Sequence, residues 1–309
     1  MLSLCIPIYN YDVRATVRRL AAQAARLDVP VEIVCIDDAS SEPFRTLNSE
    51  LGDVAKLICL ERNVGRSRIR NLFLEHTAQP YMLFLDCDSL IVDDGFLQRY
   101  VEVLLREGGS VSLVVCGGRI YPPAADRRHR LRHRYGVERE CRDAAQRRMR
   151  PYASFMTNNF VVPREVLRAI PFDESLSRYG HEDTLFGIRL AQRQVPIAHI
   201  DNPVLNGDVE ENGEFLRKTR EGVENLVDIY LSAGLEREFE QQVALVSFYK
   251  TLKSKGLLPV VRAVGRLAVP PMEWCLKCGI VSVKVFNFYK LCLFAQRMGR
   301  DNGSVQKKT

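Results

Sequence analysis

Two aspartates one residue apart, Asp86 and Asp88, follow directly on the apolar run YMLFL. If the chain stays extended beyond that run, both side chains point the same way, because side chains in a strand alternate between its faces. Their oxygens can hold Mg²⁺ or Mn²⁺, with the oxygens of a diphosphate and water completing the coordination. Aspartates at strand ends also form turns, so this tripeptide alone is compatible with a metal site or with a turn.

Other apolar runs in the first part of the chain also lead into polar groups. VEIVCI leads into Asp37 and Asp38, and one of these carboxylates can accept hydrogen bonds from a base N–H or a ribose hydroxyl, or close a turn. LSLCIPI holds Pro7 and leads into Tyr9. Gly65 then opens a helical segment, and a helix N-terminus beside guanidinium groups is a suitable place for phosphate. The guanidinium groups belong to Arg66, Arg68 and Arg70.

Alternating strands and helices are needed to bring these groups together. The runs LSLCIPI, VEIVCID, VAKLICL, YMLFLD and VSLVVCG are too short for typical helices and rich in Val, Ile and Leu, as buried strands are. Between them, helices are expected near residues 12–27, 66–77 and 94–107. This order predicts an α/β fold, with a mostly parallel, Rossmann-like sheet covered by helices on both faces. Ligands then bind at the carboxyl ends of the strands, where the polar groups gather.

The pattern changes beyond residue 150. FMTNNFVVP predicts a strand with Asn159 near its start, HEDTLFGIRLAQRQ predicts a helix, and VPIAHIDNPVL predicts a strand that enters a loop. Later helices are expected near residues 212–233 and 236–254, and glycine and proline punctuate the tail that follows, at Gly256, Pro259, Pro270 and Pro271. We therefore divide the chain into a globular domain over residues 1–234 and a basic, amphipathic helical tail over residues 235–309.

The ordered motifs IPIYN, CIDDASS, ERNVGRSRIRN, FLDCDS and YGHEDTLFGIRL resemble glycosyltransferase family 2, inverting enzymes with a GT-A fold, over residues 1 to about 230. The resemblance implies transfer of a sugar from a nucleoside diphosphate sugar, most often a UDP-sugar, to a hydroxyl of a cell-surface or lipid-linked glycan. It implies that Asp38 contacts the base, Asp86 the ribose or the metal side, and Asp88 the Mn²⁺ or Mg²⁺ ion. We predict further donor contacts by Pro7, Tyr9, Arg68, Arg70 and Asn159.

Glu182 and Asp183 open the helix predicted from HEDTLFGIRL. The resemblance implies that Asp183 takes the proton from the acceptor hydroxyl, so that attack opposite the leaving diphosphate inverts the anomeric carbon. A carboxylate near a helix N-terminus stays ionised, which suits a general base worth about 10²–10⁴ in rate. Glu182 is the close rival for this role, and we expect His181 to orient the pair rather than to bind metal.

The phrase NPVLNGD departs from the family pattern. Members often carry a histidine as third metal ligand where this chain has Asn206. A carboxamide oxygen is a weaker ligand than an imidazole, so Asn206 implies looser metal binding, replacement of the ligand by Asp208 or by water, or reduced activity. His199 on the preceding predicted strand is a less favoured ligand.

The net charge of +6 is distributed unevenly. Residues 250–309 hold 12 Lys and Arg against two acidic residues, a balance of +10, which leaves −4 for the rest of the chain. Basic residues mixed with Phe, Leu, Val and Trp274 suit an amphipathic surface on anionic lipid, so we expect peripheral membrane contact through residues 250–300. Packing of this tail on its own domain or on a partner is an equally weighted alternative.

A second basic run, at residues 127–150, holds ten arginines and three acidic residues. Because no recognised nucleic-acid motif accompanies it, we expect a solvated helix or mobile loop and no nucleic-acid partner. The functional interpretation is that residues 119–150 form part of a lid over the acceptor or the diphosphate, since the guanidinium fork matches phosphate oxygens. Cys275 and Cys278 lack the additional cysteines or histidines of a zinc site, and we expect them to be packing residues.

The apolar fraction of 46% and the charged fraction of 27% are ordinary for folded globular proteins and argue against wholesale disorder. The start MLSLCIPIYN does not fit a secretory signal, and no run is apolar enough to span a bilayer. The chain has nine cysteines, most of them within apolar runs, as is typical of buried thiols in a reducing compartment. We expect a cytoplasmic enzyme, at the inner face of the membrane if the tail binds lipid. The rival functions are a catalytically silent scaffold with the same fold and a nucleotidyltransferase, although YNYDVRATVRR lacks the Gly-rich, lysine-containing loop usual in the latter.

Overall fold

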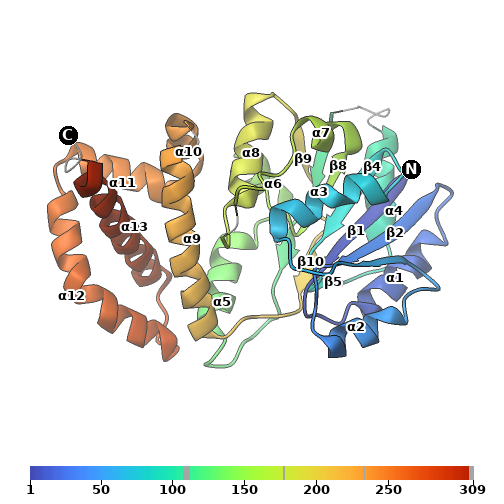
Figure 1. Ribbon diagram of the computed structural model, residues 1–309, viewed down its shortest axis with the longest axis horizontal. Helices are drawn as coiled ribbons and strands as arrows, with labels where there is room; N and C mark the ends of the chain where they lie inside the picture. Colours follow the sequence, from blue (N-terminus) through green and yellow to red (C-terminus); the bar gives the residue numbers. More distant parts are fainter. Residues whose placement is uncertain (107–111, 177, 233, 306–309) are drawn as a thin grey trace. The chain divides into compact units, whose positions relative to one another are not determined.

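The computed structural model describes residues 1–106, 112–176, 178–232 and 234–305 (Figure 1). Within these residues the chain forms two compact units. Unit 1 comprises Met1–Tyr121, Cys141–Ser177 and Glu182–Asp208, and unit 2 comprises Pro122–Glu140, Arg178–His181 and Val209–Thr309. Unit 2 includes helix α9 (Asn212–Ser232) because α13 packs on it, so this unit begins earlier in the chain than the tail predicted from residue 235.

The main sheet of unit 1 has the strand order β3-β2-β1-β4-β8-β6-β9. Neighbours pair in parallel except at β8, which runs antiparallel to both β4 and β6. The strands are β1 (Leu2–Ile8), β2 (Val31–Asp37), β3 (Lys56–Cys59), β4 (Tyr81–Leu85), β6 (Val114–Cys116), β8 (Asn159–Pro163) and β9 (Ile197–His199). This sheet confirms the predicted α/β fold with mostly parallel strands.

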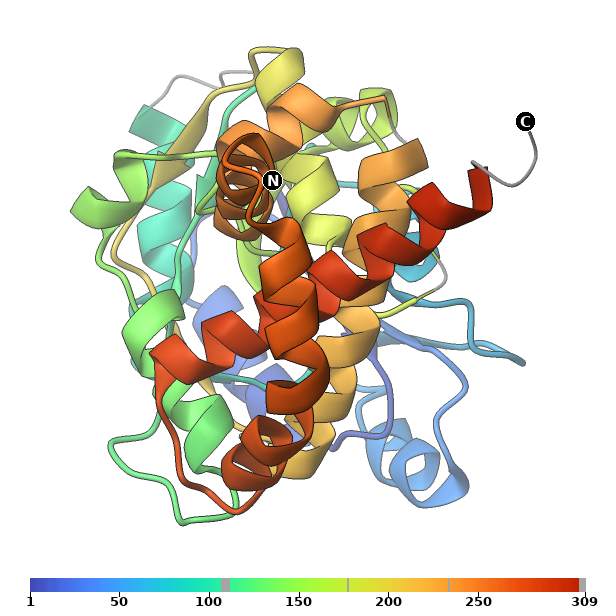
Figure 2. The same cartoon turned by 90° about the vertical axis from the view of Figure 1, so that its left-hand side faces the viewer.

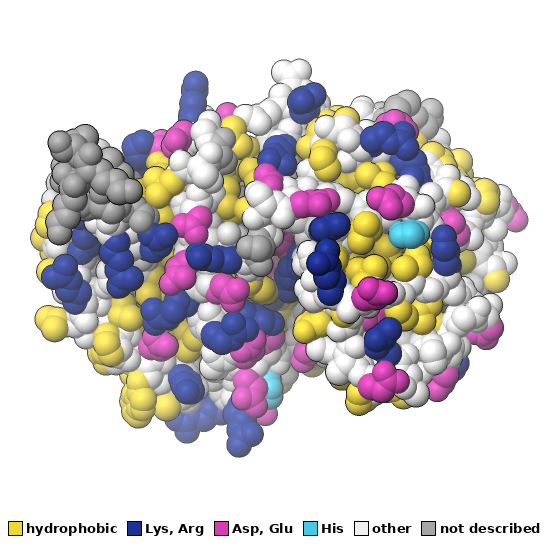
Figure 3. Space-filling model, in the orientation of Figure 1, with side chains coloured by type: hydrophobic (Ala, Val, Ile, Leu, Met, Phe, Trp, Pro, Cys, Tyr) yellow, Lys and Arg dark blue, Asp and Glu magenta, His cyan; other side chains and the backbone are white. Residues whose placement is uncertain are grey.

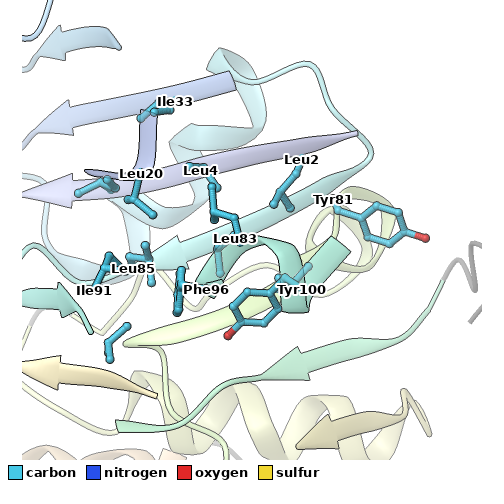
Figure 4. Packing of buried hydrophobic residues seen from close by; sticks show 14 of the residues in the cluster. Leu2, Leu4, Leu20, Ile33, Tyr81, Leu83, Leu85, Ile91, Phe96 and Tyr100 are labelled. Carbon is cyan, nitrogen blue, oxygen red and sulfur yellow. The ribbon is translucent and has the colours of Figure 1, made fainter. Parts of the chain in front are cut away.

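Apolar side chains of the central strands alternate between two clusters, one on each face of the sheet. Leu4 and Leu83 belong to one cluster, whereas Cys5 and Phe84, one position further along, belong to the other. Figure 4 shows the first cluster, with Leu20 of α1 and Phe96 of α4 packed against the strands. Since a strand period of two places successive side chains on opposite faces, these strands are buried on both sides.

Helices cover both faces of this sheet. The cluster with Leu4 includes residues of α1 (Arg14–Ala24) and α4 (Phe96–Arg106), and the other cluster includes residues of α3 (Arg66–His76), α7 (Arg164–Ala169) and α8 (Glu182–Gln192). Helix α2 (Glu42–Ser49) and α6 (Ala144–Arg148) complete the helices described in unit 1. The predicted helix over 94–107 and the predicted strand VSLVVCG each include residues outside the described part of the chain, namely 107 and 111.

A small second sheet lies beside the main one, with the order β5-β10-β7. Its strands are β5 (Ser89–Ile91), β7 (Arg119–Ile120) and β10 (Val204–Asn206). Because β10 pairs antiparallel with β5, Asn206 lies opposite Ser89, next in sequence to Asp88. This pairing joins the two predicted metal-binding segments, which are more than a hundred residues apart in sequence.

Unit 2 is helical. Its elements are α5 (Arg130–Tyr135), a π-helical turn (Gly136–Glu140), α9, α10 (Glu236–Gln242), α11 (Ala244–Ser254), α12 (Leu258–Lys277) and α13 (Val283–Val305). Helix α12 packs on α13, which also contacts α9 and α11 (Figure 2). Aromatic rings fill the space between these helices, including Tyr230, Tyr249 and Phe294.

Two predictions for the C-terminal helices are wrong in detail. The single helix expected over 236–254 is broken at Val243, whose extended backbone separates α10 from α11. Conversely, Pro270 and Pro271 lie inside α12 and do not end it. Both prolines are exposed, so water can satisfy the carbonyl groups that lose a partner there. None of the helices in the described residues is long and apolar enough to cross a bilayer.

Candidate active site

Polar residues from neighbouring strand ends meet at one edge of the main sheet in unit 1. In the sheet, β1 lies between β2 and β4, so the loops that begin at Tyr9, Asp38 and Asp86 are adjacent. Two of these loops are directly bonded: the N–H of Asn10 donates to Ser40 Oγ at 2.8 Å, and Asn10 Oδ1 accepts from the N–H of Ser41 at 2.8 Å. The carboxyl ends of parallel strands therefore form one polar surface, as predicted.

Pro7 and Tyr9 differ in their exposure at this edge. Pro7 lies within β1 opposite Ile36 and is half-buried, whereas Tyr9 follows the strand and is 53% exposed. The ring of Tyr9 is therefore accessible to a ligand above the strand ends. Asn10 and Ala39 both have positive φ, at 50° and 60°, which turns the chain sharply after β1 and β2.

Asp38 is buried and holds the loop before α3. Its Oδ1 accepts from the N–H of Val64 at 2.7 Å and its Oδ2 from the N–H of Gly65 at 3.2 Å. Burial raises the pKa of Asp38, and these two N–H groups oppose that rise. Gly65 has a φ of 83° just before the first residue of α3, a conformation that favours glycine. Asp38 thus positions the N-terminus of α3, and its predicted contact with the base remains a prediction.

The Asp-x-Asp segment forms a turn rather than a continued strand. The N–H of Ser89 donates to the carbonyl of Asp86 at 2.9 Å, so the extended conformation assumed for residues 86–88 is wrong. Asp86 Oδ1 accepts from Arg70 at 3.0 Å, and Asp88 Oδ2 accepts from Asn206 Nδ2 at 2.9 Å. The turn, closed by the pairing of β5 with β10, is what places these carboxylates.

Asn206 offers an oxygen beside Asp88. It is 4% exposed, and its Oδ1 is buried without a hydrogen-bond partner in the described structure. Burying an unpaired oxygen costs free energy unless a ligand interacts with it. The next residue, Gly207, lies so close to the backbone of Asp88 that a Cβ added to it would be 2.9 Å from the carbonyl oxygen of Asp88. Carboxylate and carboxamide oxygens, such as those of Asp86, Asp88 and Asn206, are hard donors of the kind that suits Mg²⁺ or Mn²⁺.

Nearby acidic groups reinforce the negative charge of this region. Burial raises the pKa of Tyr11, and the charges of Asp88 and Asp208 raise it further, so both carboxylates lie close to that ring. Among the described residues no three His, Cys, Asp or Glu side chains form a metal cluster. A cation here would therefore depend on the carboxamide, on water and on the diphosphate for its remaining ligands.

His199 serves the fold rather than the metal. It is fully buried, with Nε2 at 2.9 Å from the carbonyl of Pro151 and Nδ1 at 3.2 Å from Arg147. Burial lowers the pKa of His199 to about 4, so the ring is neutral at neutral pH. Since both ring nitrogens are engaged, His199 is not the third ligand.

Arg70 connects the Asp-x-Asp turn to the start of α8. Its side chain is 3% exposed; Nη2 donates to Asp86 at 3.0 Å, and Nη1 lies 3.6 Å from Oε1 of Glu182. The guanidinium group also lies over the ring of Phe172, 5.6 Å from its centre. A buried cation needs such partners, so Arg70 holds both carboxylates in place. The sequence suggested a phosphate contact for Arg70, whereas the structure shows its guanidinium group bonded to these protein carboxylates.

The two acidic residues at the start of α8 have different surroundings. Glu182 is 6% exposed and faces two arginines, with Arg66 Nη1 also 3.6 Å from its Oε1. Asp183 is partly exposed, and its Oδ1 accepts from the N–H of Thr184 at 2.6 Å. Burial raises the pKa of Asp183 to about 6, the charge of Glu182 adds to the rise, and Thr184 and Arg70 oppose it. A carboxylate with a pKa close to neutral is suited to general-base work.

The two remaining predicted donor contacts, Asn159 and Arg68, have different surroundings. Asn159 is fully buried in a network in which Oδ1 accepts from Tyr100 and Nδ2 donates to the carbonyls of Gly118 and Asn202. Its polar atoms are all used within the core, which corrects its assignment to the donor site. Arg68 is exposed on α3, with Glu174 at 3.9 Å.

The arginine-rich run is largely built into the structure. In unit 1, Arg147 is 2% exposed and donates to the carbonyls of Cys116, Gly117 and Ile200. In unit 2, Arg132 forms a bidentate pair with Glu140, at 3.0 and 3.1 Å. The expectation of a wholly solvated helix or mobile loop is therefore wrong for these positions.

The sequence reasoning missed the ion pairs that join α3 to α8. Arg66 and Arg70 are one helical turn apart, and residues four apart share a helix face, so the motif GRSRIRN already showed that two cations point together. What it could not show was that Glu182, distant in sequence, lies opposite them.

Comparisons with known proteins agree with this architecture. The model of the family described as Glycosyl transferase family 2 matches residues 3–170. Among solved structures, the mannosyltransferase PcManGT from Pyrobaculum calidifontis, in complex with GDP-Man and Mn²⁺, is similar with a TM-score of 0.58 and 15% identity, over 96% of this chain and 86% of that chain. No match was found among curated proteins.

Two further structures show weaker similarity. Glucosyl-3-phosphoglycerate synthase from Mycobacterium tuberculosis, with Mn²⁺, UDP-Glc and phosphoglyceric acid, has a TM-score of 0.50 and 16% identity, over 74% of this chain and 79% of that chain. S. aureus TarS has a TM-score of 0.50 and 16% identity, over 94% of this chain and 54% of that chain. At these identities the likeness concerns the fold, and all three have the glycosyltransferase fold named GT-A.

Proposed function

Because this chain belongs to glycosyl transferase family 2, we propose that it transfers a sugar from a nucleoside diphosphate sugar to an acceptor hydroxyl, with inversion at the anomeric carbon. The observation that carries the proposal is the buried link from Asp86 through Arg70 to Glu182. It ties the Asp-x-Asp turn to the helix start that holds Asp183, so the donor side and the proton acceptor share one rigid support.

Asp183 is the proposed general base. It accepts the proton of the acceptor hydroxyl while that oxygen bonds to the anomeric carbon, and the bond from this carbon to the diphosphate oxygen breaks on the opposite side. Its pKa of about 6 keeps the carboxylate mostly ionised at neutral pH yet basic enough to share the proton in the transition state. Glu182 is held by Arg66 and Arg70, which favours a supporting role for it.

We propose that a divalent metal ion binds at Asp88, Asp86 and Asn206. A divalent cation bound there would neutralise charge on the leaving diphosphate. The orphaned Oδ1 of Asn206 and the carboxylates supply the matching oxygen donors. Asp38 and Tyr9, at the ends of the adjacent strands, are the proposed contacts of the nucleotide, together with the exposed Arg68.

The sequence suggests a particular class of donor and a particular class of acceptor. We propose a UDP-sugar as the donor and a cell-surface or lipid-linked glycan as the acceptor, with the enzyme at the cytoplasmic face of a membrane. The basic C-terminal segment supports the membrane location. The GDP-Man and UDP-Glc in the similar structures make both nucleotides necessary in any test.

A donor screen with Mn²⁺ tests this function. UDP- and GDP-sugars are incubated with the enzyme and a glycan extract, nucleoside diphosphate release is measured, and products are identified by mass spectrometry and their anomeric configuration by NMR. We expect release with one donor class, an inverted product and no turnover by Asp88→Asn. Release of sugar 1-phosphate in place of nucleoside diphosphate would instead indicate nucleotidyl transfer.

One observation favours a second candidate, a silent scaffold with the same fold. Asn206 donates to Asp88 at 2.9 Å, which occupies one carboxylate oxygen of the metal site. Donor binding without release or transfer for every nucleotide sugar would support this candidate and contradict the enzyme.

A further inference from the structure

Helix α12 of unit 2 carries a row of exposed apolar side chains. Val260, Val264, Leu267 and Trp274 are 59%, 43%, 82% and 64% exposed. Their spacings of four, three and seven residues follow the helical repeat, so the four side chains lie along one face of the helix. We refer to these four residues as the α12 stripe.

The opposite face of α12 fixes how the helix sits within unit 2. Leu258, Gly265, Val269 and Leu276 are buried on that face, half a turn away from the stripe by the same helical repeat. A Cβ added to Gly265 would meet Cβ of Cys292 on α13 at 3.0 Å, so the two helices touch there (Figure 2). The stripe therefore points away from α13.

Basic residues surround the stripe. Between residues 244 and 300 the chain has ten Lys and Arg and one acidic residue, Glu273. Glu273 is already bonded to Arg220 and Tyr289 within unit 2. Arg266 and Lys277 are exposed on α12 along one flank of the stripe, and further exposed lysines lie close in sequence, at Lys253, Lys255 and Lys284. Figure 3 shows Lys and Arg interspersed with hydrophobic side chains over the part of the surface at the left, where Figure 1 places α12.

We propose that the α12 stripe lies in the surface of a membrane that contains anionic lipids, with Arg266 and Lys277 against the headgroups. An exposed apolar row with a basic flank is complementary to such a surface, because the acyl boundary takes the apolar side chains and the anionic headgroups take the cations. Tryptophan is enriched at this depth because its ring is apolar and its N–H is polar. The inference rests on the proposed membrane location of the transferase but not on its reaction.

Trp274 provides the measurement. It is the only tryptophan of the chain and is largely exposed, so its fluorescence reports directly on the stripe. The full chain is titrated with phosphatidylcholine vesicles, with and without phosphatidylserine. We expect an emission shift to shorter wavelength and co-sedimentation only with the anionic vesicles, and weakening of both by added salt.

Two variants separate the apolar and basic contributions. Leu267→Asp removes the most exposed apolar side chain of the stripe, and we expect at least a tenfold loss of vesicle affinity. Arg266→Ala with Lys277→Ala removes two cations, and we expect a loss of roughly 30-fold. The matched control is Leu105→Asp, a 59% exposed apolar residue on α4 of unit 1, which should bind as the original chain does.

The outcomes distinguish this inference from the proposed function. Circular dichroism checks that each variant is folded. Nucleoside diphosphate release from the donor, measured with a water-soluble acceptor, should be the same in all of them. An unchanged Trp274 spectrum with anionic vesicles, or equal affinity of Leu267→Asp, overturns the membrane face even if transfer is active. Self-association of the chain that Leu267→Asp abolishes, without vesicle binding, would identify a second copy as the occupant and overturn it as well.

Discussion

Replacing Asp183 with Asn tests the assignment of the general base. The carboxamide is nearly the same size and can still accept from Thr184, whose N–H lies 2.6 Å from Asp183 Oδ1, but it cannot take a proton. We expect kcat/KM to fall by about 10²–10⁴, the usual value of general-base catalysis. The residual rate should no longer depend on pH in the acidic range.

The pH profile of the unchanged enzyme follows from the pKa of about 6 for Asp183. The base acts when ionised, so activity is present above this pKa and lost as pH falls through it. About nine tenths of the group is ionised near pH 7 and about one tenth near pH 5, which predicts a tenfold drop in kcat/KM. Initial rates of nucleoside diphosphate release across this range, with metal saturating, measure the inflection.

Stability gives an independent check on Asp183→Asn. Because burial raises the pKa from 3.8 to about 6, the native state holds a proton that the unfolded state has lost between these values. Stability therefore decreases as pH rises through this window. The full shift corresponds to about 3 kcal/mol, but solvent reaches part of the side chain, so we expect Asn to stabilise the fold by on the order of 1 kcal/mol at neutral pH.

Glu182→Gln is the matched control. Removing the charge of Glu182 takes away one cause of the raised pKa of Asp183, so the inflection should move to lower pH and persist. The reasoning is refuted if Asp183→Asn keeps full turnover with the same inflection, or if Glu182→Gln abolishes the inflection and Asp183→Asn does not.

Three further predictions concern the support of the site and its metal. Arg70→Met should lower the free energy of unfolding by about 3–5 kcal/mol, because it leaves Glu182 with less compensation in a buried position; urea denaturation measures this, and a loss below 1 kcal/mol would contradict it. Asn206→His should tighten Mn²⁺ binding in titration calorimetry, because imidazole is the better ligand, and unchanged affinity would exclude this position from the site. Gly117→Ala should cost about 1–3 kcal/mol in thermal unfolding, since its Cβ would collide with Tyr100 and a backbone carbonyl; an unchanged midpoint would contradict it.

The fold was largely predictable because its strands can be recognised from short segments of the sequence. LSLCIPI and YMLFLD are apolar over their whole length, and only a strand buried on both faces accommodates such a short run. The order of these runs then requires the parallel core of the sheet and places Asp38 and Asp86 at one edge. The antiparallel orientation of β8 was not visible, because pairing direction is decided by neighbours far away in sequence.

The sequence allowed us to predict which residues belong to the candidate site, but not which contacts they make. Asp86 and Asp183 were identified from their motifs, yet the turn at Asp86 and the burial of Arg70 depend on tertiary packing. Asn159 shows the converse case, since an asparagine at a strand end has the same local pattern whether it faces a ligand or a core network. Only the position of Tyr100 and Asn202 around it decides between the two.

Asn206, at the position where the family resemblance implied a histidine, acts together with Asp88. An imidazole nitrogen would be a metal ligand in its own right, whereas the carboxamide uses its N–H to bind Asp88 at 2.9 Å and presents only Oδ1. The same side chain therefore orients one proposed metal ligand, Asp88, and offers a second oxygen of its own. The carboxamide is uncharged at every pH, so unlike a histidine it cannot add a positive charge beside Asp88 that would compete with a metal ion. Such a site should load metal together with the diphosphate, because the protein alone supplies too few oxygens, and Mn²⁺ affinity should rise sharply when the nucleotide is present.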